Sequence, residues 1–343
     1  MTVLDQPALD QPDSSVAPSS AKPTEPIVVR WSTVLVQNGG LFIAWGLLTA
    51  VFSLLSPDVF ASIDNFRALF STQSVMLVLA IGFLPPLVCG DLDLTPPATA
   101  GVVMVVTATL NTDYGWPIVG AIAVGVALGL AIGAVNSILV VLIGVDSIVA
   151  TLGMSTLLGG VALGIGALPI PVRSHALVTV MTHPIVGFQT AFFLALGVCT
   201  VAWFVLSHMP TGRRLFFVGA ARSTARLSGI AVGRLRTSAL MTSSLIAALA
   251  GVMMLGLFGS ATATTAPPLL LPALASVFLG ATAVTPGRFN VWGTFGAVYF
   301  LVFGIAGLET QGVSGWVSQV FYGGSLIVAV VLSRVGGLRN STS

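Results

Sequence analysis

The sequence contains very little charge. Of its 343 residues only 24 are charged, 13 Lys or Arg and 11 Asp or Glu, whereas about a quarter of the residues in a soluble protein are charged. Hydrophobic residues make up 55% of the chain, and the mean hydropathy is +1.02. A soluble domain of this size could not cover its surface with so few charges, and so apolar a chain is neither collagen-like nor disordered. The composition predicts an integral membrane protein.

Lysine, glutamate, histidine and cysteine are also scarce, which excludes several kinds of chemistry. The one lysine, Lys22, precedes a proline, so the chain has no phosphate-binding loop of the form Gly-x-x-x-x-Gly-Lys-Ser/Thr. Glu25 and Glu309 are the only glutamates, and neither belongs to a zinc motif. Cys89 and Cys199 lie in apolar runs without partners at ligand spacing. We therefore predict no catalytic residue, metal site or cofactor in this chain.

What the chain does have is a series of long uncharged runs. A membrane-spanning helix needs about 20 mostly apolar residues, and nine uncharged intervals reach that length: 31–57, 68–90, 94–112, 114–145, 147–172, 174–212, 237–287, 289–308 and 310–333. The interval 237–287 is long enough for two helices, with a break between Ser260 and Pro272. The first half of 174–212 contains two His and a Pro and is expected to form a loop. The fold class is therefore an all-α polytopic membrane protein with about ten transmembrane helices.

The distribution of basic residues predicts the orientation. With ten spans both termini lie on the same side, and placing that side in the cytoplasm puts eleven basic residues inside and only Arg67 and Arg173 outside. We therefore expect cytoplasmic termini. Residues 1–30 are rich in Pro, Ser and Asp and predict a disordered cytosolic tail, not a signal peptide. A transmembrane domain over 31–335 and a second cytosolic tail over 336–343 complete the predicted organisation.

Residues 209–236 form the only long polar interval between spans. They carry six arginines and no acid, and the predicted topology places them in the cytoplasm. One interpretation is a topological anchor whose arginines contact anionic lipid. The other is a docking element for a cytoplasmic partner, with a short helix flanked by glycines. Nucleic-acid binding is disfavoured, because Phe216 and Phe217 are the only aromatic residues in the loop.

A few polar residues lie within or beside the predicted spans. Asp91 and Asp93 are the only paired carboxylates next to apolar runs, at the cytoplasmic end of the second span, where water could solvate them. We favour a helix-capping role with Thr95 over contact with a transported solute. Asn136 and Thr151 are expected to form interhelical hydrogen bonds, with lining of a transport path as the alternative. Glycines at four-residue spacing, Gly125, Gly129 and Gly133, predict close helix packing.

The polar loop resembles the coupling segment of permeases in the ribose/xylose/galactose-type ABC importers, a superfamily shared with branched-chain amino acid permeases. That segment reads T-x-x-G-R, a few apolar residues, then G-x-N-x-x-A-A-x-x-S-G-I. By this resemblance, the loop that couples to the ATPase comprises Gly212, Arg213, Gly219, Ala220, Ala221, Ala225, Arg226, Ser228, Gly229 and Ile230. The chain departs from the pattern at Ala221, where the family has Asn.

Further motifs follow in the family's order over about residues 40–335. Among these stretches are GDLDLT at 90–95, GAVNS at 133–137, SIVATLGM at 147–154 and LGAT at 279–282. Many relatives carry E-L-D-A-I-A-A before the last motif. This chain has Leu270 and Pro272 at the two acidic positions, a departure that bears on the sugar identity and on whether the second permease is a different chain.

The resemblance implies the permease subunit of an ATP-driven importer in a prokaryotic plasma membrane. It would pass a monosaccharide or similar small polar solute by alternating access. Expected partners are cytoplasmic ATP-binding subunits that hold the ATP, a second permease subunit, an extracytoplasmic solute-binding protein and membrane lipid, without nucleic acid. Alternatives are a branched-chain amino acid or nucleoside permease and, in another class, an ATP-independent secondary transporter. A membrane-embedded enzyme is disfavoured for want of clustered acid, base or metal-binding residues.

Overall fold

Helices account for most of the chain. The structure, a computed structural model, describes residues 27–285, 287–313 and 315–340, and side chains from residue 39 to 331 within these ranges. The longer helices are α1 (Ile27–Leu55), α2 (Ile63–Thr72), α3 (Ser74–Val88), α4 (Pro96–Thr112), α5 (Ile118–Ser137), α6 (Ser147–Ile165), α8 (Thr190–His208), α11 (Val232–Phe258), α12 (Leu270–Gly280), α13 (Val291–Thr310) and α14 (Trp316–Asn340). Shorter elements are the π-helix η1 (Ile138–Ile143), α7 (His175–Thr182), α9 (Pro210–Ala220), α10 (Arg222–Leu227) and the 3-10 turn η2 (Pro267–Leu269).

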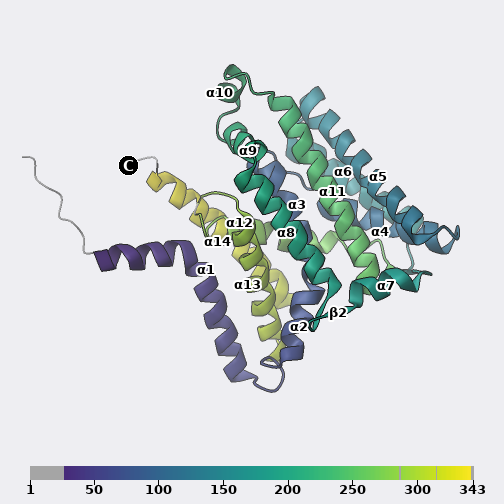
Figure 1. Cartoon of the computed structure of the whole chain (residues 1–343), viewed down its shortest axis with the longest axis horizontal. Coiled ribbons are helices and arrows are strands. Elements are labelled where there is room, and N and C mark those ends of the chain that lie inside the picture. Colours follow the sequence, from purple (N-terminus) through teal and green to yellow (C-terminus); the bar gives the residue numbers. More distant parts are fainter. Residues whose placement is uncertain (1–26, 286, 314, 341–343) are drawn as a thin grey trace, which may run out of the picture.

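Helix α11 lies at the centre of the bundle and packs against α3, α4 and α5 (Figure 1). Small residues allow this close approach. A Cβ on Gly129 would lie 2.5 Å from the Cβ of Ala248, and one on Gly133 would lie 3.0 Å from Ser244. The close packing predicted for this glycine series is confirmed, and it buries most of α11 and α4.

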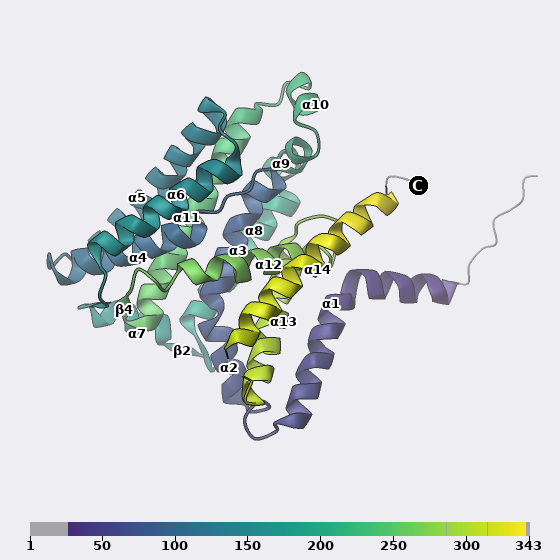
Figure 2. The same cartoon turned by 180° about the vertical axis from the view of Figure 1, so that it is seen from behind.

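A second group of helices, α12, α13 and α14, packs beside this bundle, and α1 packs against α13 (Figure 2). Aromatic side chains fill the contact between the groups. Phe70 of α2 lies between Tyr299 and Phe303 of α13, with ring centroids 4.5 and 5.4 Å away, and Trp45 of α1 stacks on Tyr299. Burial of such large rings stabilises the contact strongly.

Five of the described helices are long and apolar enough to cross a membrane: α5 with η1, α6, α8, α11 and α13. Helices α2 and α3 form a sixth candidate if the pair, bent by 41°, is one span. Shorter apolar helices cover 39–55, 267–280 and 316–331. A mostly helical membrane fold with little strand is confirmed, and the count of ten spans and the cytoplasmic termini stay predictions.

The predicted break after α11 is present. Gly259 ends the helix in a left-handed conformation, strand β4 (Ser260–Ala261) pairs with β1 (Ile170–Pro171), and α12 begins only after the prolines of η2. The expected loop in the first half of 174–212 is in part wrong. It contains α7 and a hairpin of β2 (Pro184–Ile185) and β3 (Phe188–Gln189), because Leu177 and Met181 bury one face of α7 against α11.

The two ends of the molecule differ. Helices α9 and α10 lie at one end, and α2 and α7 lie at the other (Figures 1 and 2). The predicted tail over 1–30 lies outside the described residues up to residue 26, and α1 begins at Ile27. Of the predicted tail over 336–343, residues up to Asn340 belong to α14 and the last three lie outside the described part.

Candidate functional site

The connection between α3 and α4, residues 89–95, forms many hydrogen bonds to the helices around it. Its backbone pairs with side chains of α6: Leu92 N donates to Ser147 Oγ at 3.3 Å, and Leu94 N donates to Thr151 Oγ1 at 3.1 Å. Thr151 in turn donates to the carbonyls of Leu92 and Ser147. These bonds satisfy backbone groups that would otherwise be buried without a partner.

Asp91 forms ion pairs with two arginines of the loop 209–236, Arg222 and Arg236. Arg222, the first residue of α10, donates to Asp91 Oδ1 at 2.7 Å and to the carbonyl of Gly90 at 2.8 Å. Arg236 of α11 donates to both carboxylate oxygens, at 2.7 and 2.8 Å. The Asp91 side chain is only 3% exposed. We call Asp91, Arg222 and Arg236 the latch, because they tie the 89–95 segment to the start of α10 and to the first turns of α11.

Asp93 lies deeper, in a second polar cluster. Its Oδ1 accepts from Thr95 N at 2.9 Å and Thr95 Oγ1 at 2.6 Å, and its Oδ2 accepts from Ser243 Oγ of α11 at 2.8 Å. Asn136 of α5 donates to Thr95 Oγ1 at 3.0 Å, and its own Oδ1 has no partner within the described residues. Asp93, Thr95 and Asn136 are all 0% exposed. The cluster joins α4, α5 and α11 just before the first turn of α4.

The four residues predicted as possible pathway groups therefore meet at one place. Asp91, Asp93, Asn136 and Thr151 all contact the 89–95 segment or form part of it. The expectation that water solvates the two carboxylates is wrong: they are 3% and 0% exposed, because α6, α10 and α11 enclose them. Each of the four side chains is already hydrogen-bonded to protein. This arrangement therefore suits a structural connection between helices better than the lining of a solute path.

One consequence of the Asp93 cluster can be measured through Ser243→Ala. This change leaves Oδ2 of a fully buried carboxylate without its donor and is expected to lower the free energy of unfolding by about 2 kcal/mol. Ser238→Ala is the matched control, because Ser238 is exposed and bonds only a carbonyl of its own helix. Thermal unfolding of both variants in detergent measures the effect. Equal midpoints for the two variants would contradict the assigned bond.

The predicted coupling loop folds into α9 and α10 (Figure 1). Gly212 and Ala225 are buried, Ile230 and Ala221 are half-buried, and the remaining predicted residues, Arg213, Gly219, Ala220, Arg226, Ser228 and Gly229, are exposed. Ala221 ends α9 and precedes α10. Gly229 has a φ of +77°, which favours glycine at the turn after α10. Leu227 projects from the end of α10 with 88% of its surface exposed.

Gly219 lies where α9 meets the end of α3. A Cβ at this position would overlap the carbonyl oxygen of Val88, and Gly90, with a φ of +80°, faces Gly219 from the other side. Backbone therefore touches backbone at the base of the latch. Only glycine permits this approach.

Sequence reasoning missed Arg222, Arg236, Ser243 and Ser147 as members of this site. The six loop arginines are alike in sequence, and Arg222 and Arg236 lie 131 and 145 residues from Asp91. The one available signal was an unpaired acid beside an apolar run, facing a loop with arginines and no acid. That signal indicates that the acid and the loop could pair, but it does not say which of the six arginines contact Asp91.

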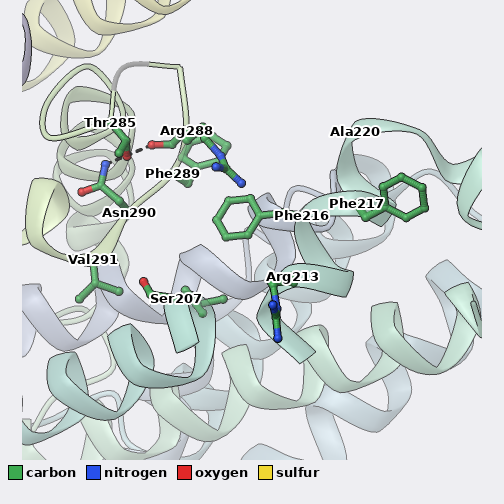
Figure 3. Close-up of a pocket in the computed structure, with 11 residues that line it drawn as sticks. Ser207, Arg213, Phe216, Phe217, Ala220, Thr285, Arg288, Phe289, Asn290 and Val291 are labelled. Carbon is green, nitrogen blue, oxygen red and sulfur yellow. Dashed lines mark hydrogen bonds between the residues drawn. The ribbon is translucent and has the colours of Figure 1, made fainter. Parts of the chain in front are cut away.

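A cavity of about 590 Å³ lies beside α9 at the same end of the molecule. Figure 3 shows Phe216 pointing toward Arg288 and Phe289, with Arg213 on the near side of α9. The guanidinium of Arg288 lies 4.6 Å from the centre of the Phe216 ring, a cation–π contact. In the part of the chain that the structure describes, neither Arg213 nor Arg288 pairs with a carboxylate. The cavity therefore presents positive charge and aromatic surface next to the predicted coupling loop.

Within the described ranges, no three His, Cys, Asp or Glu side chains gather as a metal site. Comparison with known proteins supplies what this geometry alone does not. The family described as branched-chain amino acid transport system / permease component matches residues 65–330. The chain belongs to this family. It is thus the permease component of an ABC transporter, not its catalytic subunit, and lies in the bacterial inner membrane.

Curated relatives of this permease cover most of its length. It is 28% identical over 304 residues to the D-allose transport system permease protein of Escherichia coli K12, covering 86% of this chain and 91% of that protein. It is 25% identical over 303 residues to the ribose import permease protein of Haemophilus influenzae, covering 87% and 93%. It is 28% identical over 294 residues to the autoinducer 2 import system permease protein of Salmonella paratyphi B, covering 82% and 86%. No solved structure matches the permease.

Proposed function

We propose that this permease carries a monosaccharide into the cell as part of an ATP-driven importer. Two similar proteins are named for D-allose and ribose, and a third for autoinducer 2, which supports a small, oxygen-rich solute. The family description names branched-chain amino acids instead. Uptake of labelled ribose, allose and leucine by the reconstituted importer distinguishes these two candidates.

The proposed topology has ten spans with both termini in the cytoplasm. Helices α1, α4, α12 and α14 join the six longer candidates to make ten, and the eleven-to-two division of basic residues supports the orientation. The loop 209–236 then lies in the cytoplasm, and α7 with its hairpin lies outside. The domain over 31–335 would be flanked by cytosolic tails over 1–30 and 336–343.

The proposed partners follow from these two ends. ATP-binding subunits, which hold the ATP, would dock on α10 and the exposed residues beside it. An extracytoplasmic solute-binding protein would dock at the end that carries α2 and α7. A second permease subunit would complete the path, and lipid would cover the exposed apolar faces of α5, α6 and α8.

The ion pairs of the latch are the main structural support for the proposed mechanism. It connects α10, where a motor subunit would push, to the 89–95 segment, and that segment is bonded to α4, α5, α6 and α11 through the two polar clusters. Movement of α10 would therefore reach four transmembrane helices through charge-assisted hydrogen bonds. Alternating access by rocking these helices is the function that this arrangement supports best.

Leu227→Asp tests the docking role of α10. Its exposed side chain makes few contacts within the chain, so thermal stability should stay within about 0.5 kcal/mol of wild type. Docking of the ATPase would cover the new carboxylate and leave its charge buried without a partner. Docking should therefore weaken, and ATP-driven uptake should fall about tenfold or more. Leu168→Asp is the control for ATPase co-purification, since Leu168 is 78% exposed in the connection after α6, which the proposed topology places outside. If the ATPase co-purifies with Leu227→Asp as well as with the wild type, α10 is not its docking site.

A further inference from the structure

A second cavity, of about 770 Å³, lies among α2, α3, α12, α13 and α14. It lies away from the latch: its walls include the junction of α2 with α3, the end of α13 and the start of α14, and α2 lies opposite α9 and α10 (Figures 1 and 2). In the proposed topology this is the outer end. A solute released there by a binding protein would meet this cavity first.

The cavity combines an apolar wall with five polar groups, three of which have no protein partner among the described residues. Leu69, Met76, Val302, Ile305 and Ala306 supply the apolar surface. The polar groups are Gln73, Glu309, Ser318, Gln319 and Tyr322. Within the described residues, the Gln73 and Gln319 amides and the Tyr322 hydroxyl form no hydrogen bond.

These free groups match a polyol. Amides and a phenol can both donate to and accept from hydroxyl groups, and Glu309, which accepts only from Ser318 at 3.3 Å, has capacity for further donors. A volume of this size lies within the range of small-molecule sites, which are mostly apolar with a few placed polar groups.

The same cavity offers little to an anion. None of its described lining residues is Arg, Lys or His. The helical start beside it is blocked as well, since Pro267 and Pro268 have no N–H, and the N–H groups of Leu269 and Leu270 already donate to Ala266 and Pro267. A carboxylate or phosphate would find no cationic partner here and would lie near the carboxylate of Glu309, which disfavours an amino acid or a phosphorylated sugar.

We infer that this cavity is the solute site of the permease and that it takes a neutral monosaccharide. Gln73 and Gln319 face the solute from α2–α3 and α14, and Tyr322 and Glu309 complete the polar wall. The inference rests on the proposed function. It also replaces the pathway role considered for Asp91, Asp93, Asn136 and Thr151, which lie enclosed near the opposite end.

A reversible thiol modification tests the site on one folded protein. The importer carrying Gln319→Cys, assembled with its ATPase and binding protein, is treated in detergent with a bulky methanethiosulfonate, checked by intact mass and reconstituted. Native Cys89 and Cys199 are buried. We expect uptake of labelled ribose or allose to fall about tenfold or more on modification and to return after reduction, with basal ATP hydrolysis unchanged.

Val320→Cys is the matched control. Val320 is the next residue of α14, is 62% exposed and does not line the cavity, so its modification should leave uptake at the wild-type rate. Gln73→Leu gives a second position, where loss of the amide should lower sugar uptake about tenfold.

The outcomes separate this inference from the proposed function. If the wild-type importer moves sugars and modified Gln319→Cys moves them equally well, the cavity is not the site and the sugar function stands. If the wild type moves leucine but neither sugar, the proposed function fails and the assignment of this cavity to a sugar fails with it. Loss at Gln319 with transport preserved at Val320 is the result that the structure predicts.

Discussion

Asp91→Asn is expected to lower ATP-driven uptake by about 100-fold. The substitution keeps the size of the side chain but leaves Arg222 and Arg236 facing a neutral amide, one of whose atoms is itself a donor. Removing one partner of a buried ion pair costs about 3 kcal/mol, which corresponds to roughly 100-fold in an equilibrium constant. The loop would then no longer be tied to the 89–95 segment. Uptake in proteoliposomes and the thermal midpoint in detergent measure the two consequences.

Two variants calibrate this result. Asp58→Asn removes the same charge from an exposed residue that has no ion-pair partner among the described residues, and it should leave uptake unchanged. Arg222→Met should cost less thermal stability than Asp91→Asn, since Arg236 keeps both carboxylate oxygens bonded, but it should still lower uptake because it removes the contact between α10 and Asp91. Normal coupled uptake by Asp91→Asn would show that the latch has no role in transmission.

Gly219→Ala is the second large expected effect. The added methyl group would overlap the carbonyl oxygen of Val88, and backbone cannot move aside as a side chain can. Overpacking of this kind costs about 1–3 kcal/mol. Helix α9 would have to move away from α3, and Arg222, three residues further on, would move away from Asp91. We expect ATP-driven uptake to fall at least about tenfold.

The control for this variant is Gly153→Ala. Gly153 lies within α6, and a Cβ there meets nothing within 4 Å. The change should therefore be neutral or, through helix propensity, stabilising by up to about 1 kcal/mol. If both glycine variants transport at the same rate, the close approach of α9 to α3 does not matter for coupling.

Hydropathy and charge predicted most of the helices because those features act locally. Uncharged runs of sufficient length became α5, α6, α8, α11 and α13, and prolines marked the break before α12. Helix α7 was predicted as a loop because His175, His183, Pro184 and Gln189 at and beyond its ends dominate the local signal. The burial of Leu177 and Met181 depends on packing against α11, where Gly256 provides space for Met181, and the local sequence does not show this contact.

The candidate site was predicted as residues but not as an arrangement. The family-like motifs drew attention to Asp91, Asn136, Thr151 and the loop 209–236, and the structure brings them to one segment. Burial of Asp91 and Asp93 could not be predicted from span counting, which gives an approximate depth but not the neighbours. Long-range pairs such as Asp91 with Arg236 are a product of tertiary packing.

In the proposed mechanism, ATP hydrolysis by a partner subunit drives a sugar through this permease by way of the latch. The most direct measurement is uptake of labelled ribose and allose into proteoliposomes that hold the permease, its ATPase and its binding protein, with and without ATP. We predict uptake only with ATP, and its loss in Asp91→Asn despite correct assembly. Uptake that proceeds equally without ATP would contradict this mechanism and identify a secondary transporter.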